Sequence, residues 1–166
     1  MSNTVFDIDR NKHTITVISK YQASLELLWA AWTQSAMLDN WWAPQPWKVE
    51  TKEMNFVQDG RWLYAMVSPE GEKMWSLIEY IEISPLQYFI GADAFCDENG
   101  VKNYSQHPGS KWHTSFEQTQ GETTVTNVIS FDSTEAMDDM LDMGFREGFQ
   151  MGLGNLEEYL SNHTNK

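Results

Sequence analysis

The sequence predicts an α+β fold in which a curved antiparallel sheet wraps around one long C-terminal helix. Between residues 46 and 131 the apolar residues recur with a period of two, and turn sequences such as Asp59-Gly60 separate the segments. After residue 133 the period changes to three and four, which is typical of an amphipathic helix. Antiparallel strands need one covered face, and this helix is the available cover. The expected order is one strand, two helices, six strands and one long helix.

The chain begins with a strand and two helices. Residues 12–20 (KHTITVISK) alternate and are rich in β-branched side chains, which predicts a strand. Ser24 is a suitable N-cap for an amphipathic helix over 24–33. A second short helix is expected over 35–41, because Pro44 disfavours helix at the residue before it.

Six strands are expected next. Their predicted ranges are 47–55, 60–68, 73–83, 86–92, 111–118 and 122–131. A polar loop from Asp93 to Ser110 separates the fourth from the fifth of these, and its length favours a functional or mobile segment over a simple connection.

The C-terminal helix is predicted to start at the cap residue Ser133. Its apolar stripe consists of Leu141, Phe145, Phe149, Leu153, Leu156 and Leu160. Gly144, Gly148 and Gly152 lie four residues apart, on one flank of this helix. Each glycine costs a helix about 1 kcal/mol, so their repetition indicates a packing or cavity requirement.

Length and charge exclude several classes of protein. The 166 residues suit one domain, with a core expected over about 12–160. The 11 basic and 24 acidic residues give a formal charge of −13, which argues against a nucleic-acid partner and against docking on anionic membranes. With neither a signal peptide nor an apolar segment long enough to span a bilayer, a cytoplasmic protein is expected.

Sites for metals, cofactors or nucleophilic catalysis are not predicted. The four histidines lack metal-ligand spacing, and only His107, in the long polar loop, is of interest. Cys96 is the single cysteine, which excludes an intramolecular disulfide, and its acidic neighbours raise rather than lower its pKa. We therefore expect no metal, no cofactor and no catalytic residue.

The aromatic residues carry the functional hypothesis. The chain has 8 Trp, 8 Phe, 6 Tyr and 9 Met. Several of these share strand or helix faces: Trp62, Tyr64 and Met66; Trp112 and Phe116; Phe145 and Phe149. Rings grouped in this way form either an ordinary core or the wall of an apolar pocket. The helix glycines favour a cavity, whereas Trp29 and Trp32 are expected in the core.

Two polar residues share predicted strand faces with apolar ones. Glu79 has the parity of Trp75 and Leu77, and Asn127 has the parity of Val125 and Ile129. A buried carboxylate or amide needs a hydrogen-bond partner. Each is either a polar anchor inside an apolar pocket or turned outward by a bulge or a change of register.

Four segments resemble the activator of 90-kDa heat-shock protein ATPase homologue family, in the START-related SRPBCC superfamily. They are SLELLWAAWTQSAMLDNWWAP (24–44), QDGRWLYAMVSPEG (58–71), IEISPLQYF (81–89) and MGFREGFQMGLGNLEEYL (143–160). The resemblance implies a helix-grip fold, similar to START domains and birch allergens, with a deep cavity between the sheet and the last helix. Superfamily relatives bind lipids, sterols or other apolar molecules there. The separate chaperone-docking domain of the co-chaperone has no counterpart in this sequence.

These observations favour non-catalytic binding of a small hydrophobic ligand, with aromatic molecules included, in that cavity. The expected ligand-binding residues are Trp42, Trp62, Tyr64, Met66, Trp75, Glu79, Trp112, Phe116, Asn127, Phe145, Gly148 and Phe149. A co-chaperone-like interaction module, with an exposed apolar patch around Trp41, Trp42 and Trp47, remains an alternative. Homodimerisation is open, as is an enzyme that uses Glu79 or His107 as acid or base.

Overall fold

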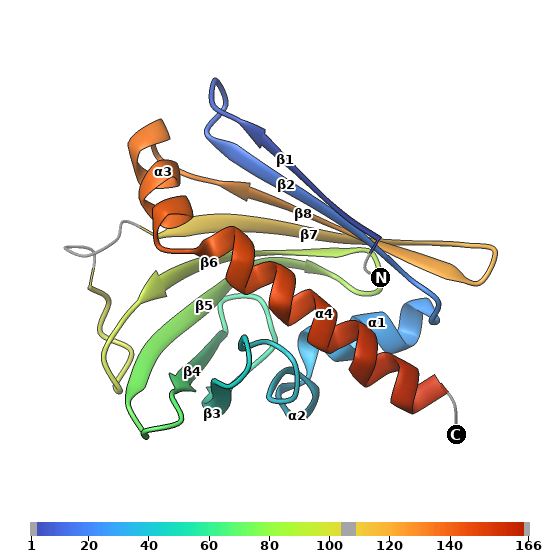
Figure 1. Ribbon diagram of the computed structural model, residues 1–166, viewed down its shortest axis with the longest axis horizontal. Helices are drawn as coiled ribbons and strands as arrows, with labels where there is room; N and C mark the ends of the chain where they lie inside the picture. The colour runs from blue at the N-terminus through green and yellow to red at the C-terminus, as the bar shows by residue number, and fades with distance from the viewer. Residues whose placement is uncertain (1–2, 104–108, 165–166) are drawn as a thin grey trace.

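The computed structural model describes residues 3–103 and 109–164, and this part of the chain forms one curved sheet with helices on its concave side (Figure 1). All neighbouring strands are antiparallel, in the order β1-β2-β8-β7-β6-β5-β4-β3. The strands are β1 (Asn3–Asp9), β2 (Thr14–Tyr21), β3 (Lys48–Met54), β4 (Arg61–Val67), β5 (Lys73–Ser84), β6 (Tyr88–Phe95), β7 (Ser110–Thr119) and β8 (Glu122–Ser130).

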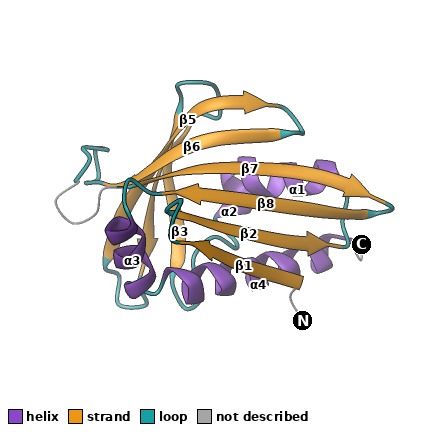
Figure 2. Cartoon of the chain, turned by 90° about the horizontal axis from the view of Figure 1, so that it is seen from above, coloured by secondary structure: helices purple, strands orange, loops and turns teal. Residues whose placement is uncertain are grey.

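Helices lie between β2 and β3 and after β8. They are α1 (Leu25–Thr33), α2 (Ser35–Leu38), α3 (Thr134–Asp142) and α4 (Phe145–Thr164). Helix α4 crosses the open side of the sheet, and in the second view β7 and β8 pass in front of α1 and α2 (Figure 2). This arrangement confirms the predicted α+β, helix-grip architecture. No helix in the described ranges combines the length and apolar character needed to cross a membrane.

Local signals in the sequence account for where the first helices begin and end. The Ser24 hydroxyl accepts a hydrogen bond from the backbone N–H of Leu27 at 3.1 Å and caps α1, as expected. After α2 the chain turns back, and the Trp41 indole N–H donates to the Ala31 carbonyl at 3.0 Å. The turn that follows α2 is thereby fixed against α1.

Aromatic rings fill the space between α1, α4 and the sheet. Trp29 packs edge-on against Phe116, with ring centroids 5.1 Å apart, and Trp32 packs against Trp41 at 4.8 Å. Trp32 and Trp41 are almost fully buried. Both helix tryptophans therefore lie in the core, as the sequence indicated. Edge-to-face pairs of this kind add about 0.5–1.5 kcal/mol each beyond burial alone.

The sheet has one strand more than predicted, because Asn3–Asp9 forms β1. It pairs along its whole length with β2, and Phe6 packs edge-on against Phe149 of α4 with centroids 6.4 Å apart. The ordered fold thus starts before residue 12, where the core was expected to begin. Two aspartates in β1 obscure the strand signal, since Asp is depleted in strands.

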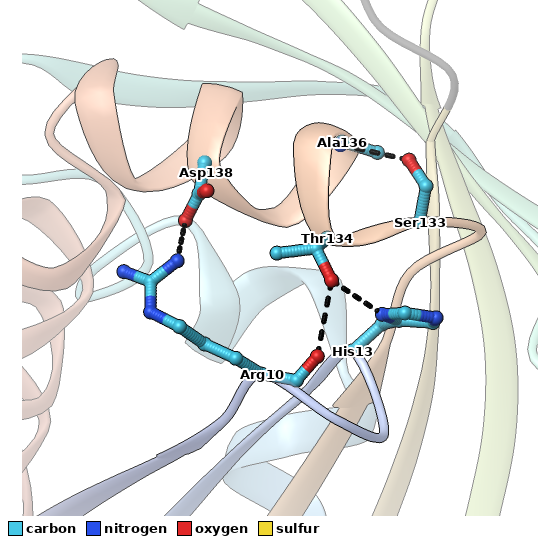
Figure 3. Close-up of polar contacts among 6 residues, drawn as sticks. All are labelled: Arg10, His13, Ser133, Thr134, Ala136 and Asp138. Carbon is cyan, nitrogen blue, oxygen red and sulfur yellow. Dashed lines mark hydrogen bonds and ion pairs between the residues drawn. The ribbon is translucent and has the colours of Figure 1, made fainter.

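The turn between β1 and β2 is tied to the start of α3 (Figure 3). The Thr134 hydroxyl donates to the Arg10 carbonyl at 3.0 Å, and His13 Nδ1 lies 2.8 Å from the Thr134 hydroxyl oxygen. Because Thr134 has one hydroxyl proton, His13 donates from Nδ1 in this contact. Arg10 also pairs with Asp138. These contacts position α3 beside the sheet.

The sequence predicts one long C-terminal helix, whereas the structure has two helices, α3 and α4. Gly144 has a φ of +91°, outside the helical region, and its N–H donates to the Leu141 carbonyl at 3.0 Å. Helix α3 therefore ends before Gly144 and α4 begins directly after it. The apolar stripe continues from Leu141 to Phe145 across this break, which conceals it in the sequence.

Candidate ligand-binding site

A cavity of about 240 Å³ lies between the sheet and the α3–α4 junction. Strands β4 to β7 form one wall, and the ends of α3 and α4 together with the turn at Trp42–Pro44 form the other. Met74 and Met143, each about half exposed, lie where the cavity meets solvent. The position matches the predicted cavity between the sheet and the C-terminal helix.

Rings and methionines form most of the wall. Six rings line the cavity: Phe95, which the sequence did not predict, and the five predicted rings Trp42, Tyr64, Trp112, Phe145 and Phe149. The five predicted rings contact one another: the Trp42 and Trp112 centroids lie 5.9 Å apart, and Trp112 and Phe149 lie 5.3 Å apart. Because each ring is held by its neighbours, the wall is formed before any ligand arrives. Seven of the twelve predicted residues line this cavity: these five rings with Met66 and Gly148.

Gly152 of α4 allows the Trp42–Pro44 turn to come close to the helix. A Cβ at Gly152 would lie 3.1 Å from the Trp42 carbonyl oxygen, a contact tighter than ordinary. At Gly148 the nearest atom would be Pro44 Cγ, at an ordinary 3.9 Å. Asn155 also donates to the Ala43 carbonyl at 3.0 Å. The absence of a side chain at Gly152 therefore lets the turn, and with it Trp42, pack against α4.

One end of the cavity is polar. Asp93 of β6 lines it, and its Oδ1 accepts hydrogen bonds from the Ser110 N–H at 2.7 Å and from the Ser110 hydroxyl at 2.6 Å. The Ser110 oxygen in turn accepts from the Trp112 indole N–H at 3.1 Å. This chain of contacts fixes the carboxylate and the Trp112 ring relative to each other.

Tyr64 adds a second polar group to the same wall. Its hydroxyl accepts from the Trp42 indole N–H at 3.0 Å, and its strand partner Ser76 also lines the cavity. Burial raises the pKa of Tyr64 well above its ordinary value, and the nearby charge of Asp93 acts in the same direction. The hydroxyl therefore keeps its proton at neutral pH and serves as a neutral hydrogen-bonding group.

Trp62 lies deeper than the cavity. It stacks on Tyr64 with centroids 4.0 Å apart and donates from its indole N–H to Thr51 at 3.0 Å. With Trp42 and Trp112 it borders a separate void of about 20 Å³, which is room for about one water molecule. Trp62 thus supports the cavity wall from behind.

Asn127 faces the interior, so the outward alternative does not apply to it. It is fully buried, and its Oδ1 accepts from the Thr114 hydroxyl at 2.7 Å. Its Nδ2 has no hydrogen-bond partner among the described residues. Asn127 is not among the residues that line the cavity, so the structure places it as a core amide paired with Thr114.

The expectation that Trp75 and Glu79 face the cavity is wrong. Tyr64 pairs with Ser76 across β4 and β5, so the even-numbered residues of this part of β5 face inward. Glu79 lies on the outer face, where its half-exposed side chain pairs with Lys102. Trp75 lies on the same face, and Lys52 Nζ sits 5.7 Å from its ring centroid. The sequence assigned the odd-numbered residues of β5 to the inner face because Leu77 is apolar; Leu77 is indeed buried, but on the outer face.

Other predicted features lie away from the cavity. Phe116 packs in the core against Trp29. Trp41 is 1% exposed and Trp42 and Trp47 are partly buried, so the apolar surface patch expected around them is not formed. His107 lies outside the described residues.

The reactive-group predictions can also be compared with the structure. Burial, and then the charge of Asp97, raises the pKa of the Cys96 thiol, which makes it a poor nucleophile. Within the described ranges, no group of three or more His, Cys, Asp or Glu side chains is arranged to hold a metal ion.

Sequence reasoning missed several residues of the cavity. Asp93 was assigned to a loop, yet β6 extends to Phe95, and Phe89, Gly91, Asp93 and Phe95 follow the inward period of two. This alternation is the signal that could have revealed it. Ser76 was missed through the parity error, and Met140 and Met143 because α3 was not recognised as a separate helix.

Comparison with solved structures shows the same fold in bacterial proteins. Protein Ms6760 from Mycobacterium smegmatis is 24% identical with a TM-score of 0.87, over 96% of this chain and 98% of that one. A protein from Staphylococcus epidermidis is 27% identical with a TM-score of 0.82, over 94% of each chain. The AHSA1 protein from Silicibacter pomeroyi is 18% identical with a TM-score of 0.71, over 90% of this chain and 99% of that one.

Comparison with protein families gives one match that spans most of the chain. Residues 22–161 match the model of the Activator of Hsp90 ATPase homolog 1-like protein family. The matched range includes α1 to α3, β3 to β8 and α4 up to residue 161, and therefore every described residue that lines the cavity. Among curated proteins, none matches the chain.

Proposed function

The chain belongs to the Activator of Hsp90 ATPase homolog 1-like family, and from this premise we propose that it binds a small hydrophobic ligand, without transforming it, in the cavity between the sheet and the α3–α4 junction. The family and the fold support a helix-grip module of one of two kinds, a ligand-binding module or a co-chaperone-like module. The ligand and its chemical class belong to the proposal.

The observation that carries the proposal is the cavity with its ring-lined wall. An apolar cavity of about 150 Å³ is enough to hold benzene. At about 240 Å³, this cavity suits a ligand of one or two rings. Trp42 and Trp112 offer ring faces and edges for stacking, and the methionines adapt to the shape of a guest.

Affinity would come from burial of apolar surface, reduced by the cost of ordering the ligand. A two-ring compound such as 1-naphthalenemethanol has about twelve non-hydrogen atoms, and roughly 0.3–0.5 kcal/mol per atom corresponds to a Kd of roughly 0.05–2 mM. The co-chaperone-like alternative is supported by the family match alone, whereas ligand binding is supported by the family match and by the cavity.

The test is calorimetric titration of the protein with 1-naphthalenemethanol, using two variants of α4. Gly148→Leu places a side chain at a residue that lines the cavity and should weaken binding at least about tenfold, because the added leucine occupies the space of the ligand. Gly154→Leu is the matched control, since its side chain enters open space on the same helix. Thermal melts verify that both variants fold.

Two results would contradict the proposal. One is no binding by the unmodified protein, and the other is equal binding by both variants. Recovery of the compound unchanged, measured by mass spectrometry, tests the non-catalytic part. A pull-down with the 90-kDa heat-shock chaperone, together with its rate of ATP turnover, tests the co-chaperone-like alternative.

A further inference from the structure

The long aliphatic side chains of the cavity wall all belong to methionine. Met66, Met74, Met140 and Met143 line the cavity, and none of the described residues that line it is Leu, Ile or Val. The core beside the cavity is rich in all three of those residue types. The wall therefore differs from the core in the kind of aliphatic side chain that it uses.

The four methionines form two pairs, one on each wall. Met66 of β4 and Met74 of β5 are direct partners across these antiparallel strands. Met140 lies in α3 and Met143 is the C-cap of that helix, so the second pair is three residues apart at the α3–α4 junction. In each pair one member is half exposed, at 48% for Met74 and 55% for Met143, whereas Met66 and Met140 are partly buried.

Methionine differs from leucine mainly in flexibility and in its sulfur. Both side chains are apolar and similar in volume, and exchanges between them are well tolerated in cores. The methionine thioether is flexible, and it can be oxidised to a sulfoxide, which is polar. Flexibility is of use at any depth in a wall, whereas oxidation requires contact with solvent. Met74 and Met143 provide that contact where the cavity opens.

We propose that Met74 and Met143 are sites of oxidation to methionine sulfoxide by hydrogen peroxide, and that this modification weakens ligand binding in the cavity. The inference rests on the proposed function, since it names a form of regulation for the same cavity. In the reaction the O–O bond of the peroxide breaks, one oxygen atom forms a bond to the thioether sulfur, and water leaves. The sulfur is oxidised by two electrons and the peroxide is reduced by them. Hydrogen peroxide is uncharged, so the formal charge of −13 does not repel it.

The sulfoxide changes the mouth of the cavity from apolar to polar. A polar group that faces an apolar ligand loses contact with water without gaining a hydrogen-bond partner. A loss of this kind corresponds to about a tenfold lower affinity. Methionine sulfoxide reductases restore the thioether, so the effect is reversible.

The test is limited treatment of the full chain with hydrogen peroxide at pH 7, followed by peptide mass spectrometry and calorimetric titration with 1-naphthalenemethanol. Met74 and Met143 should gain oxygen before Met66 and Met140, and the fully buried Met137 should react last. The affinity for the probe should fall about tenfold, while a thermal melt shows that the protein is still folded. Methionine sulfoxide reductases for both sulfoxide epimers, supplied with a dithiol, should restore the affinity.

Two leucine variants assign the effect, each compared with its own untreated form. In Met74→Leu/Met143→Leu, peroxide should change the affinity by less than about twofold, because both sulfur atoms at the mouth are gone. Met151→Leu is the matched control, since Met151 of α4 is 52% exposed and is not among the residues that line the cavity. This control should still lose about tenfold in affinity. Both variants keep Cys96, so a loss caused by oxidation of its thiol would appear in both.

The outcomes separate the two proposals. If the untreated protein does not bind the probe, the proposed function fails and the inference fails with it. If it binds, and oxidation at Met74 and Met143 changes the affinity by less than about twofold, the inference is overturned while the proposed function stands.

Three other results would overturn the assignment to these two methionines. They are oxidation of Met66 and Met140 ahead of Met74 and Met143, a loss of binding that persists in Met74→Leu/Met143→Leu, and a loss that comes only with unfolding. The comparison of treated with untreated unmodified protein decides the main point even where the double variant does not fold.

Discussion

Alanine substitutions at the glycines of α4 test the packing that forms the cavity. Alanine is favoured over glycine in a helix by about 1 kcal/mol. At Gly154 a Cβ would meet no atom within 4 Å, so Gly154→Ala should gain this full amount. At Gly152 a Cβ would lie 3.1 Å from the Trp42 carbonyl oxygen and 3.4 Å from that of Trp41. Overpacking costs about 1–3 kcal/mol, so Gly152→Ala should lose about 1 kcal/mol net.

The assay is equilibrium unfolding in urea, followed by circular dichroism, with a thermal melt of each variant. For a chain of this size, 1 kcal/mol corresponds to about 2–4 °C in Tm. We expect Gly154→Ala to melt above the unmodified protein and Gly152→Ala below it. Equal stabilisation by both variants would refute the close approach of α4 to the Trp42 backbone.

Three further predictions concern buried and exposed polar groups. Thr114→Val leaves the buried Asn127 without its hydrogen bond and should lower the free energy of unfolding by about 1–3 kcal/mol. The double variant Thr114→Val/Asn127→Leu should recover most of this loss, as measured by urea unfolding. Burial raises the pKa of three tyrosines, Tyr21, Tyr64 and Tyr80. Unfolded tyrosines lose their protons near pH 10 while these three retain them, so their contribution to stability should be constant below that pH. Above it, the free energy of unfolding should fall by up to about 1.4 kcal/mol per pH unit per tyrosine, as urea unfolding and tyrosinate absorbance at increasing pH will show. Glu79→Gln removes an outer-face ion pair and should change stability by less than about 1 kcal/mol and ligand affinity not at all; a loss of binding in calorimetry would contradict its placement on the outer face.

Periodicity predicted the architecture because it records which faces are buried. The helix at 24–33 and five of the six strands after α2 lie within about one residue of the predicted bounds, whereas β6 runs three residues beyond its predicted end. The break at Gly144 could not be found in this way, since the four-residue spacing from Leu141 to Phe145 is maintained across it. Helix α3 ends because Gly144 adopts a positive φ. A glycine permits this conformation, but its presence in the sequence does not by itself predict it.

The position of the cavity was predicted from the sequence, and so were the lining residues on β4 and α4. Tyr64 and Met66 alternate with residues of the opposite face, and Phe145 and Phe149 are one helical turn apart, so their directions followed from local geometry. Asp93 was missed because β6 runs directly into a polar segment. In the middle of β5, Leu77 on the outer face and Ile78 on the inner face are both buried, so alternation there does not distinguish inside from outside.

The central claim, that the cavity holds an apolar ligand, is tested most directly by the tryptophan indole N–H signals in a ¹H–¹⁵N NMR titration with 1-naphthalenemethanol. The signals of Trp42 and Trp112 should shift, since both rings line the cavity, while that of Trp75 on the outer face should not. Saturable shifts at Trp42 and Trp112, with Trp75 unchanged, are the predicted result. A titration that moves Trp75 first, or leaves Trp42 and Trp112 unchanged, would contradict the account.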